Sequence, residues 1–229
     1  MNRLHVICLF ATFLIVSVCA AHPASAQSAD VPVMNCEPAQ AESIIDANNV
    51  RAKILNSGAL FSDWSEPVYE VSKGSGKHSM FTASIWLAGL VNGEVRASAS
   101  RFGIREYWPG PYDEVAAGAD CAAYDRIYKV ERRDFNALES GVELSLDILE
   151  WPWQHAAPVV DGDSNPDNYD LAAGDRPLLL GDEMHYWIMN DIGNEHRSTK
   201  GLPMGLEVHA MAFSSASTLN PHYANTRCS

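Results

Sequence analysis

Residues 80–101 read MFTASIWLAGLVNGEVRASASR, and this stretch predicts the fold more directly than any other part of the chain. Its first half is apolar and aromatic, whereas Val95, Ala97 and Ala99 in the second half alternate with charged or hydroxyl residues. Asn92-Gly93 separates the halves, and Asn-Gly favours a two-residue hairpin turn because both positions tolerate positive φ. The stretch therefore predicts a β-hairpin.

Short segments on both sides of the hairpin favour further strands. Residues 50–55 alternate apolar and basic side chains and end at the turn Asn56-Ser57-Gly58. Other strands are predicted at 69–71, 126–130, 178–180, 186–189 and 206–213, and short helices at 39–49, 133–138 and 142–149. Because no strand–helix–strand rhythm is present, the sequence predicts an all-β or β-rich fold. We expect an antiparallel β-sandwich-like single domain with short helices and long loops.

The N-terminus has the parts of an export signal. Asn2 and Arg3 give a short basic start, an apolar run follows, and Ala24-Ser25-Ala26 is the small-x-small pattern that signal peptidase cleaves. The apolar core is short for a membrane span and no charged stop-transfer flank follows it, although an uncleaved anchor is the alternative. We therefore predict a signal peptide over 1–26, no transmembrane segment after its cleavage, and a secreted or cell-surface protein.

The remainder of the chain divides into three parts by composition. Residues 27–47 form a polar leader, 48–213 form the β-rich secreted module, and 214–229 form an irregular tail. The tail follows a strand-like segment and has little pattern of its own, which favours a truncated chain. About 203 residues remain after cleavage, a length that suits one sandwich-type domain.

Three cysteines remain after the predicted cleavage: Cys36, Cys121 and Cys228. An odd number allows one internal disulfide and leaves one thiol. Cys36–Cys121 is the predicted pair, because Cys228 lies one residue from the end of the chain in a segment expected to fray.

The charge of the chain excludes one class of partner. The formal net charge is −13, and loss of Arg3 with the signal makes it −14. Nucleic-acid binding requires a basic face, so no nucleic-acid partner is expected. An acidic surface instead suits solubility outside the cell or binding of divalent cations.

One acidic stretch has the spacing of a calcium loop. Oxygen-bearing side chains alternate at 161, 163, 165 and 167, and such a loop can turn them inward around a hard cation. The spacing follows the first half of an EF-hand loop, but Pro166 replaces the turn glycine and Ala172 the bidentate glutamate. A solvated acidic turn is the alternative. The predicted Ca²⁺ ligands are Asp161, Asp163, Asn165, Asp167, Asp170 and Asp175.

No catalytic motif stands out, and an enzyme is the less favoured class. Gly74-Ser75-Gly76-Lys77 departs from a phosphate loop, because Val71 stands where the first glycine belongs and His78 follows the lysine. The six histidines outside the signal lack metal-ligand spacing, and neither Gly-x-Ser-x-Gly nor His-Glu-x-x-His occurs. A carboxylate pair for glycoside hydrolysis stays open because the chain has many acids.

Six tryptophans raise the alternative of carbohydrate binding, since exposed aromatic rings stack on sugars. Trp86 and Trp187 lie in strand-like runs and are expected in the core. Trp108, Trp151 and Trp153 flank prolines and are the candidates for an exposed, sugar-binding face.

Several segments, taken in order, resemble the N-terminal region of large secreted surface proteins of Bacteroidota-type bacteria, which commonly carry a C-terminal type IX secretion sorting domain. The resemblance covers most of 48–213 and implies a cell-surface address, with cell-surface components or glycans as partners. In such relatives the acidic segment looks like a calcium loop, and Gly174-Asp175-Arg176-Pro177 matches its end. We expect no such sorting domain within these 229 residues. The matching segments are 48–52, 69–71, 73–79, 107–111, 121, 124–126, 181–182, 187, 190–191, 193–194, 196 and 205–208.

Overall fold

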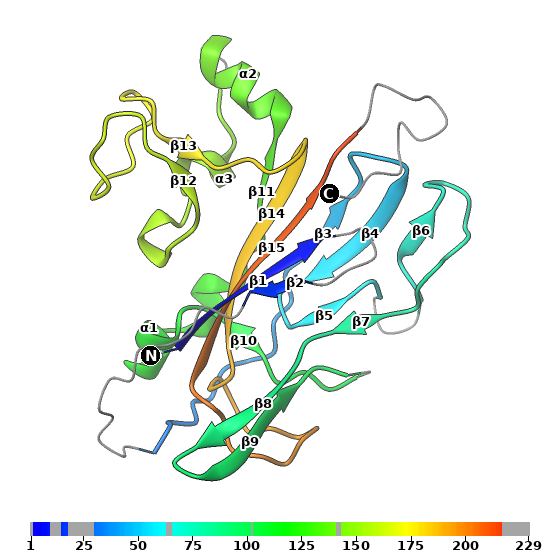
Figure 1. Cartoon of the computed structure of the whole chain (residues 1–229), viewed down its shortest axis with the longest axis vertical. Coiled ribbons are helices and arrows are strands. Elements are labelled where there is room, and N and C mark those ends of the chain that lie inside the picture. The colour runs from blue at the N-terminus through cyan, green and yellow to red at the C-terminus, as the bar shows by residue number, and fades with distance from the viewer. Residues whose placement is uncertain are drawn as a thin grey trace.

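The computed structural model describes residues 2–9, 15–17, 30–62, 66–101, 103–140 and 143–216. These residues form two packed β-sheets, a separate hairpin and a layer of short helices and long loops (Figure 1). The β-rich class predicted from the sequence is therefore confirmed. The signal-peptidase site at Ala24–Ala26 and the tail beyond Ala216 lie outside the described residues.

The larger sheet is built on two long, buried strands. β14 (Glu183–Asn190) and β15 (Leu206–Ser214) pair antiparallel along the whole length of β14. β10 (Trp108–Pro109) and β11 (Tyr128–Glu131) also pair antiparallel with β14. β1 (Asn2–Leu9) runs parallel to β15, and β2 (Ile15–Ser17) pairs antiparallel with β1. Both strands fall within residues 1–26, the predicted signal peptide, so after the predicted cleavage β15 would be the edge strand of this sheet. All residues of β14 are buried, as expected for a strand covered on both faces.

The smaller sheet lies against one face of the larger one. Its strands are β3 (Glu42–Ile45), β4 (Val50–Leu55), β5 (Ala59–Leu60), β6 (Tyr69–Val71) and β7 (Ala83–Ser84), all paired antiparallel. Between the sheets, Ile54 of β4 joins one apolar cluster with Trp187 of β14 and Ala210 of β15. This inter-sheet core is the sandwich that the alternating strand patterns predict.

The hairpin predicted from Asn92-Gly93 is present. β8 (Trp86–Val91) and β9 (Glu94–Ala99) pair antiparallel with Val91 opposite Glu94. Asn92 and Gly93 both have positive φ, at 54° and 84°, as the two-residue turn requires.

Short helices and loops cover the second face of the larger sheet. There Trp151 packs with Met184 and Tyr186 of β14 in a second apolar cluster. The helical elements are α1 (Tyr112–Ala116), η1 (Cys121–Tyr124), α2 (Arg132–Ser140), α3 (Leu146–Leu149) and η2 (Trp153–His155). Within the described residues, no helix combines the length and apolar character that crossing a membrane requires.

The predicted disulfide is formed. Cys36 and Cys121 are bonded, with Cα atoms 5.7 Å apart and 85 residues between them in sequence. The bond joins the leader to η1 beside Trp108 and Ile192, where both cysteines are buried in a third apolar cluster. Residues 30–36 thus form part of the folded domain, although they lack regular secondary structure.

Two element predictions are wrong. The helix predicted over 39–49 is strand β3, because pairing with β4 and burial of Ile45 between the sheets outweigh a weak helical pattern. Residues 178–180 are not a strand: Leu179 and Leu180 pack on the second cluster from a loop. A short apolar run reports burial but not backbone conformation. Part of the helix predicted over 142–149 is found as α3, and its first residue lies outside the described ranges.

Candidate metal site

The acidic loop 161–175 is closed at its base by a short ladder. β12 (Val159–Val160) pairs antiparallel with β13 (Arg176–Pro177). Just beyond the ladder, Gly162 passes so close to Gly174 that a Cβ on Gly162 would lie 2.4 Å from the Gly174 carbonyl carbon. Glycine at 162 is therefore required for this crossing, which brings both ends of the loop together.

Asp175 lies buried at this crossing. Its carboxylate accepts hydrogen bonds from the backbone N–H of Gly162, at 2.8 Å, and of Asp170, at 2.7 Å. These bonds connect the two ends of the loop through one side chain. Tyr169 connects the loop to α3, because its hydroxyl donates a hydrogen bond to the Ile148 carbonyl at 3.0 Å. Burial, and next the charge of Asp175, raise the pKa of Tyr169, so its hydroxyl stays protonated as the donor.

Two exposed aspartates fold the first half of the loop. Asp161 Oδ1 accepts hydrogen bonds from the backbone N–H of Asp163, Ser164 and Asn165. Asp163 accepts from the Asn165 N–H and from the Asn168 side-chain amide, and the bond from Asn168 is the main reason that the pKa of Asp163 is lowered. Hydrogen bonds from the backbone therefore fix the orientation of both carboxylates, and the lowered pKa keeps Asp163 ionised at neutral pH.

The crossing brings three carboxylates together. Ligand oxygens of Asp161, Asp163 and Asp175 all lie within 4.8 Å of one another. Among the histidine, cysteine and acidic side chains of the described residues, this is the one group with metal-ligand spacing. Within those ranges no basic side chain forms a salt bridge with an acid of the loop, so no ion pair offsets this concentration of charge.

The other three predicted ligands lie outside this group. The side-chain oxygen of Asn165 accepts the Asp167 N–H, at 3.3 Å, and Asp170 accepts the N–H groups of Ala172 and Ala173. Asp167 is exposed. The structure therefore brings together the first two positions of the alternating series and the acid at the far end, and it uses Asn165 and Asp170 to form turns.

The three carboxylates suit a hard cation. Ca²⁺ takes six to eight oxygen ligands, and three aspartates with carbonyl oxygens and water are an ordinary donor set for it. The absence of cysteine and histidine from the group disfavours zinc. The residues present therefore fit Ca²⁺, with Asp161, Asp163 and Asp175 as the protein carboxylates.

The backbone amides of the glycine-rich turn at 74–76 are already hydrogen-bonded to a side chain of the protein. Glu70 of β6 accepts the N–H groups of Gly74, at 2.9 Å, and Gly76, at 2.5 Å. The first of these bonds is the largest contribution to the lowered pKa of Glu70. Because these amides already bind a carboxylate, the turn does not offer them to a phosphate.

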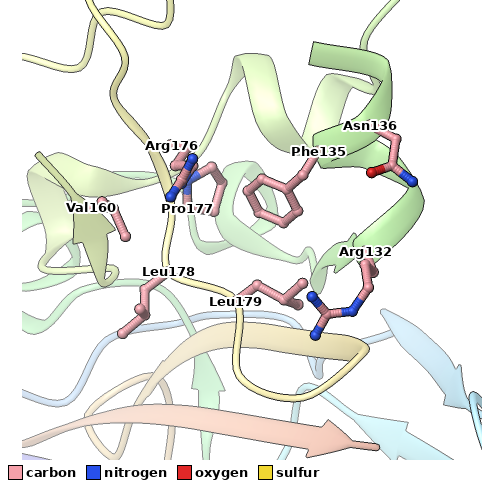
Figure 2. A pocket seen from close by; sticks show the side chains of 8 residues that line it. All are labelled: Arg132, Phe135, Asn136, Val160, Arg176, Pro177, Leu178 and Leu179. Carbon is pink, nitrogen blue, oxygen red and sulfur yellow. The ribbon is translucent and has the colours of Figure 1, made fainter. Parts of the chain in front are cut away.

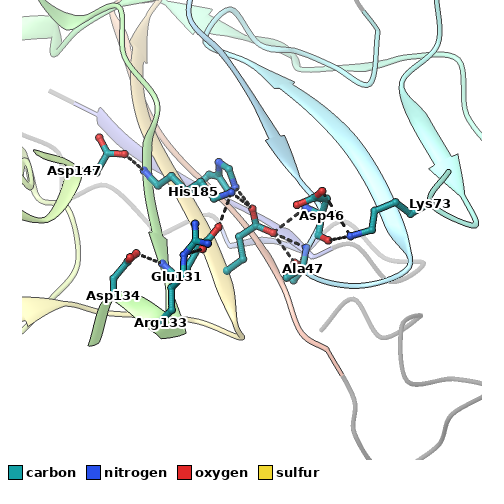
Figure 3. Close-up of polar contacts among 11 residues, drawn as sticks. Asp46, Ala47, Lys73, Glu131, Arg133, Asp134, Asp147 and His185 are labelled. Atoms are coloured by element: carbon teal, nitrogen blue, oxygen red, sulfur yellow. Dashed lines mark hydrogen bonds and ion pairs between the residues drawn. The ribbon is translucent and has the colours of Figure 1, made fainter. Parts of the chain in front are cut away.

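Two groups of buried acids and histidines were not predicted from the sequence, and Figure 3 shows the group that contains His185. Glu183 of β14 contacts His185 at 3.0 Å and Lys129 at 2.7 Å, and accepts the N–H groups of Asp46 and Ala47. On the opposite face, Glu207 and His209 are 2.6 Å apart. Alternation of charged and apolar residues in Glu183–Asn190 was the available signal, but it predicts exposure of the charged face. Here both faces are covered.

The tryptophans are distributed differently from the prediction. Trp187 is in the core as expected, but Trp108 and Trp151 are also buried, with 4% and 1% of their surface exposed. Trp86, which was expected in the core, is 68% exposed on β8. Trp108 is buried because β10 pairs with β14, and Trp151 packs on β14 just before η2, whereas the outer face of the hairpin has no covering layer within the described residues. No family model, curated protein or solved structure matches this chain.

Proposed function

We propose that this chain is an exported, non-catalytic, β-rich module of a secreted or cell-surface protein, and that loop 161–175 holds a structural Ca²⁺ ion. One observation carries the calcium assignment. The oxygens of Asp161, Asp163 and Asp175 converge within 4.8 Å, at a crossing that depends on glycine at 162. The export signal, the Cys36–Cys121 disulfide and the acidic surface support a location outside the cytoplasm.

Calcium would stabilise the loop by offsetting repulsion that the fold itself creates. Backbone N–H groups hold the carboxylates in place, but they carry only partial charges and do not neutralise three anions. An ion bound between Asp161 and Asp175 would connect the start of the loop to its end. Its binding energy would then become folding energy for β12, β13 and the loop that they carry.

Thermal unfolding with excess Ca²⁺ and then with a chelator tests this proposal. At a free Ca²⁺ concentration 100 times the Kd, binding adds about 2.7 kcal/mol to the free energy of unfolding. For a domain of about 200 residues, this raises the Tm by roughly 5–10 °C. Equal melting temperatures in both conditions, with no heat of Ca²⁺ binding in calorimetry, would refute a calcium site.

The loop itself offers a matched control. Asp163→Asn removes a carboxylate of the group, whereas Asp167→Asn removes the same charge from the same loop outside the group. We expect Asp163→Asn to weaken Ca²⁺ binding at least about tenfold and Asp167→Asn to change it by less than about threefold. Equal losses in both variants would indicate a diffuse attraction between ion and loop.

Carbohydrate binding is the second candidate, and the observation that favours it is Trp86. Its indole N–H donates to the Ser100 carbonyl at 2.8 Å and contacts the Ser84 hydroxyl at 2.9 Å, so the ring is held in place although it is 68% exposed. A cavity of about 140 Å³ adjoins the ring, with hydroxyl and guanidinium groups in its lining. A rigid aromatic ring beside polar groups is suited to stacking against a sugar. The lining residues are Ala59, Ser62, Thr82, Ser84, Trp86, Arg101, Gly103 and Arg105.

A glycan array distinguishes this second candidate. A bound glycan should be lost on Trp86→Ala and kept on Leu90→Ala, which removes another exposed apolar side chain of the same hairpin. Loss of binding in both variants would indicate nonspecific adhesion to the hairpin. Absence of any glycan signal would leave the calcium-stabilised module as the function.

A further inference from the structure

A second cavity lies between α2 and the ladder that carries the acidic loop (Figure 2). Its volume is about 380 Å³, within the range of small-molecule sites. About half of the wall is apolar, formed by Phe135 from the helix and by side chains of the segment that follows the loop. The lining residues are Arg132, Phe135, Asn136, Val160, Arg176, Pro177, Leu178 and Leu179.

Two arginine side chains line this cavity, and they differ in whether an acidic side chain pairs with them. Arg132 is held by Asp182, at 2.5 Å, and by the Gly181 carbonyl, at 2.7 Å. Arg176 is exposed and lies over the Phe135 ring, with 5.9 Å between its Cζ and the ring centroid. Within the described residues, no carboxylate forms a salt bridge with Arg176. In a chain of net charge −13, an arginine that has no acidic partner among the described residues and lies beside a partly apolar cavity is suited to an anionic ligand.

We propose that this cavity binds a small organic acid in which a carboxylate is attached to a six-membered ring. A guanidinium group donates two parallel hydrogen bonds to a carboxylate, which assigns that group to Arg176. The ring would lie against Phe135 and the apolar side chains of Pro177 and Leu179, which Figure 2 shows around the same space. Aromatic acids and uronic acids share this chemistry.

The cavity is connected to the calcium loop through the backbone. Asp175 of the carboxylate group directly precedes Arg176, and the β12–β13 ladder contributes Val160, Arg176 and Pro177 to the cavity wall. An ion that fixes Asp175 would also fix the residue that binds the acid. We therefore infer that Ca²⁺ and the acid bind cooperatively, which rests on the proposed function. Reciprocity requires each ligand to improve the affinity of the other by the same factor.

Calorimetric titration of the purified chain with benzoate and with galacturonate tests the site and distinguishes the two kinds of acid. We expect at least one of them to bind, and Arg176→Gln to raise its Kd at least about tenfold. Arg133→Gln is the matched control, because Arg133 is an exposed arginine of α2 beside the cavity but does not line it. Its effect should be less than about twofold.

Three results would overturn the cavity assignment: no binding of either acid below about 10 mM, equal binding by Arg176→Gln, or equally tight binding of uncharged benzyl alcohol. Cooperativity is tested by repeating the titration in chelator, where the Kd for the acid should rise. If Ca²⁺ binds but leaves that Kd unchanged, the coupling is wrong. If no Ca²⁺ binds, the proposed function fails, whereas the Arg176→Gln comparison still decides the cavity.

Discussion

Glu183 allows a stability prediction with a defined pH range. This side chain is buried, with 1% of the residue exposed. Burial alone would raise its pKa, but hydrogen bonds from His185, Lys129 and the Asp46 N–H outweigh burial and lower the pKa from 4.5 to about 2. The charged carboxylate is therefore bound more strongly in the folded protein than in the unfolded chain.

The magnitude follows from that shift. The interval from 4.5 to about 2, at about 1.4 kcal/mol for each pH unit, corresponds to about 3 kcal/mol of stability. Because the folded-state pKa is the lower one, this contribution is complete above the unfolded pKa of 4.5 and is lost as the pH falls from 4.5 towards 2.

Glu183→Gln tests this reasoning because glutamine has nearly the shape of the protonated acid. Urea unfolding at pH 7 in chelator should show the variant about 3 kcal/mol less stable than the wild type. The difference should fall below about 1 kcal/mol near pH 2.5, which lies well below the unfolded pKa of 4.5 and only just above the folded pKa of about 2, so that most of the contribution has been lost. Glu131→Gln is the control, since Glu131 also pairs with Lys129 but is more exposed, and its cost should stay near 1 kcal/mol. A Glu183→Gln deficit that is the same at both pH values would refute the electrostatic account.

Three further predictions concern the loop, the disulfide and the tryptophans. Gly162→Ala should reduce Ca²⁺ affinity at least about tenfold in calorimetry, because its Cβ would meet the Gly174 backbone at 2.4 Å; Gly89→Ala, whose nearest contact is 3.6 Å, should leave it unchanged. Cys36→Ala with Cys121→Ala should lower the free energy of unfolding by roughly 3–5 kcal/mol, the chain-entropy value for 85 residues, and a loss below about 1 kcal/mol would contradict that estimate. Trp108→Ala should cost about 3–5 kcal/mol and Trp86→Ala less than about 1 kcal/mol in the same assay, because only Trp108 is buried; equal costs would contradict the burial pattern.

The sequence predicts correctly those parts of the fold that depend on a few neighbouring residues. Asn92-Gly93 requires positive φ in a two-residue turn, and the hairpin follows at that position. Residues 178–180 failed as a strand because an apolar run is equally compatible with a loop that packs on the core. The predicted burial of Trp86 and exposure of Trp108 were both wrong for a related reason. Which face of a strand is covered depends on elements distant in sequence, and periodicity does not contain that information.

The sequence identified the acidic loop, but not which of its side chains lie together. Alternation at 161, 163, 165 and 167 suggested four ligands from one stretch, as in a loop that coils around its ion. The structure instead closes the group with Asp175, which the Gly162–Gly174 crossing returns to the start of the loop. That crossing depends on the β12–β13 ladder, whose two-residue strands have no recognisable pattern. Asp167 is separated from the group by the turn at Pro166, where the EF-hand spacing was already broken.

Two other buried acids of this chain differ from Asp175 in the groups that surround them. Glu106 accepts the N–H groups of Ala99, Ser198 and Thr199, and Asp191 accepts those of Met204 and Leu206. Each of these carboxylates is surrounded by donors, and it stabilises the fold by satisfying backbone groups that would otherwise be buried without partners. Asp175 also accepts two N–H groups, but it has two further carboxylates as neighbours. A fold that could satisfy the same amides with one acid gains nothing from placing three together, unless a cation completes the group. A carboxylate surrounded only by N–H donors is therefore a structural acid, whereas a carboxylate that also has other carboxylates beside it is a candidate metal ligand. Charge and burial alone do not make this distinction.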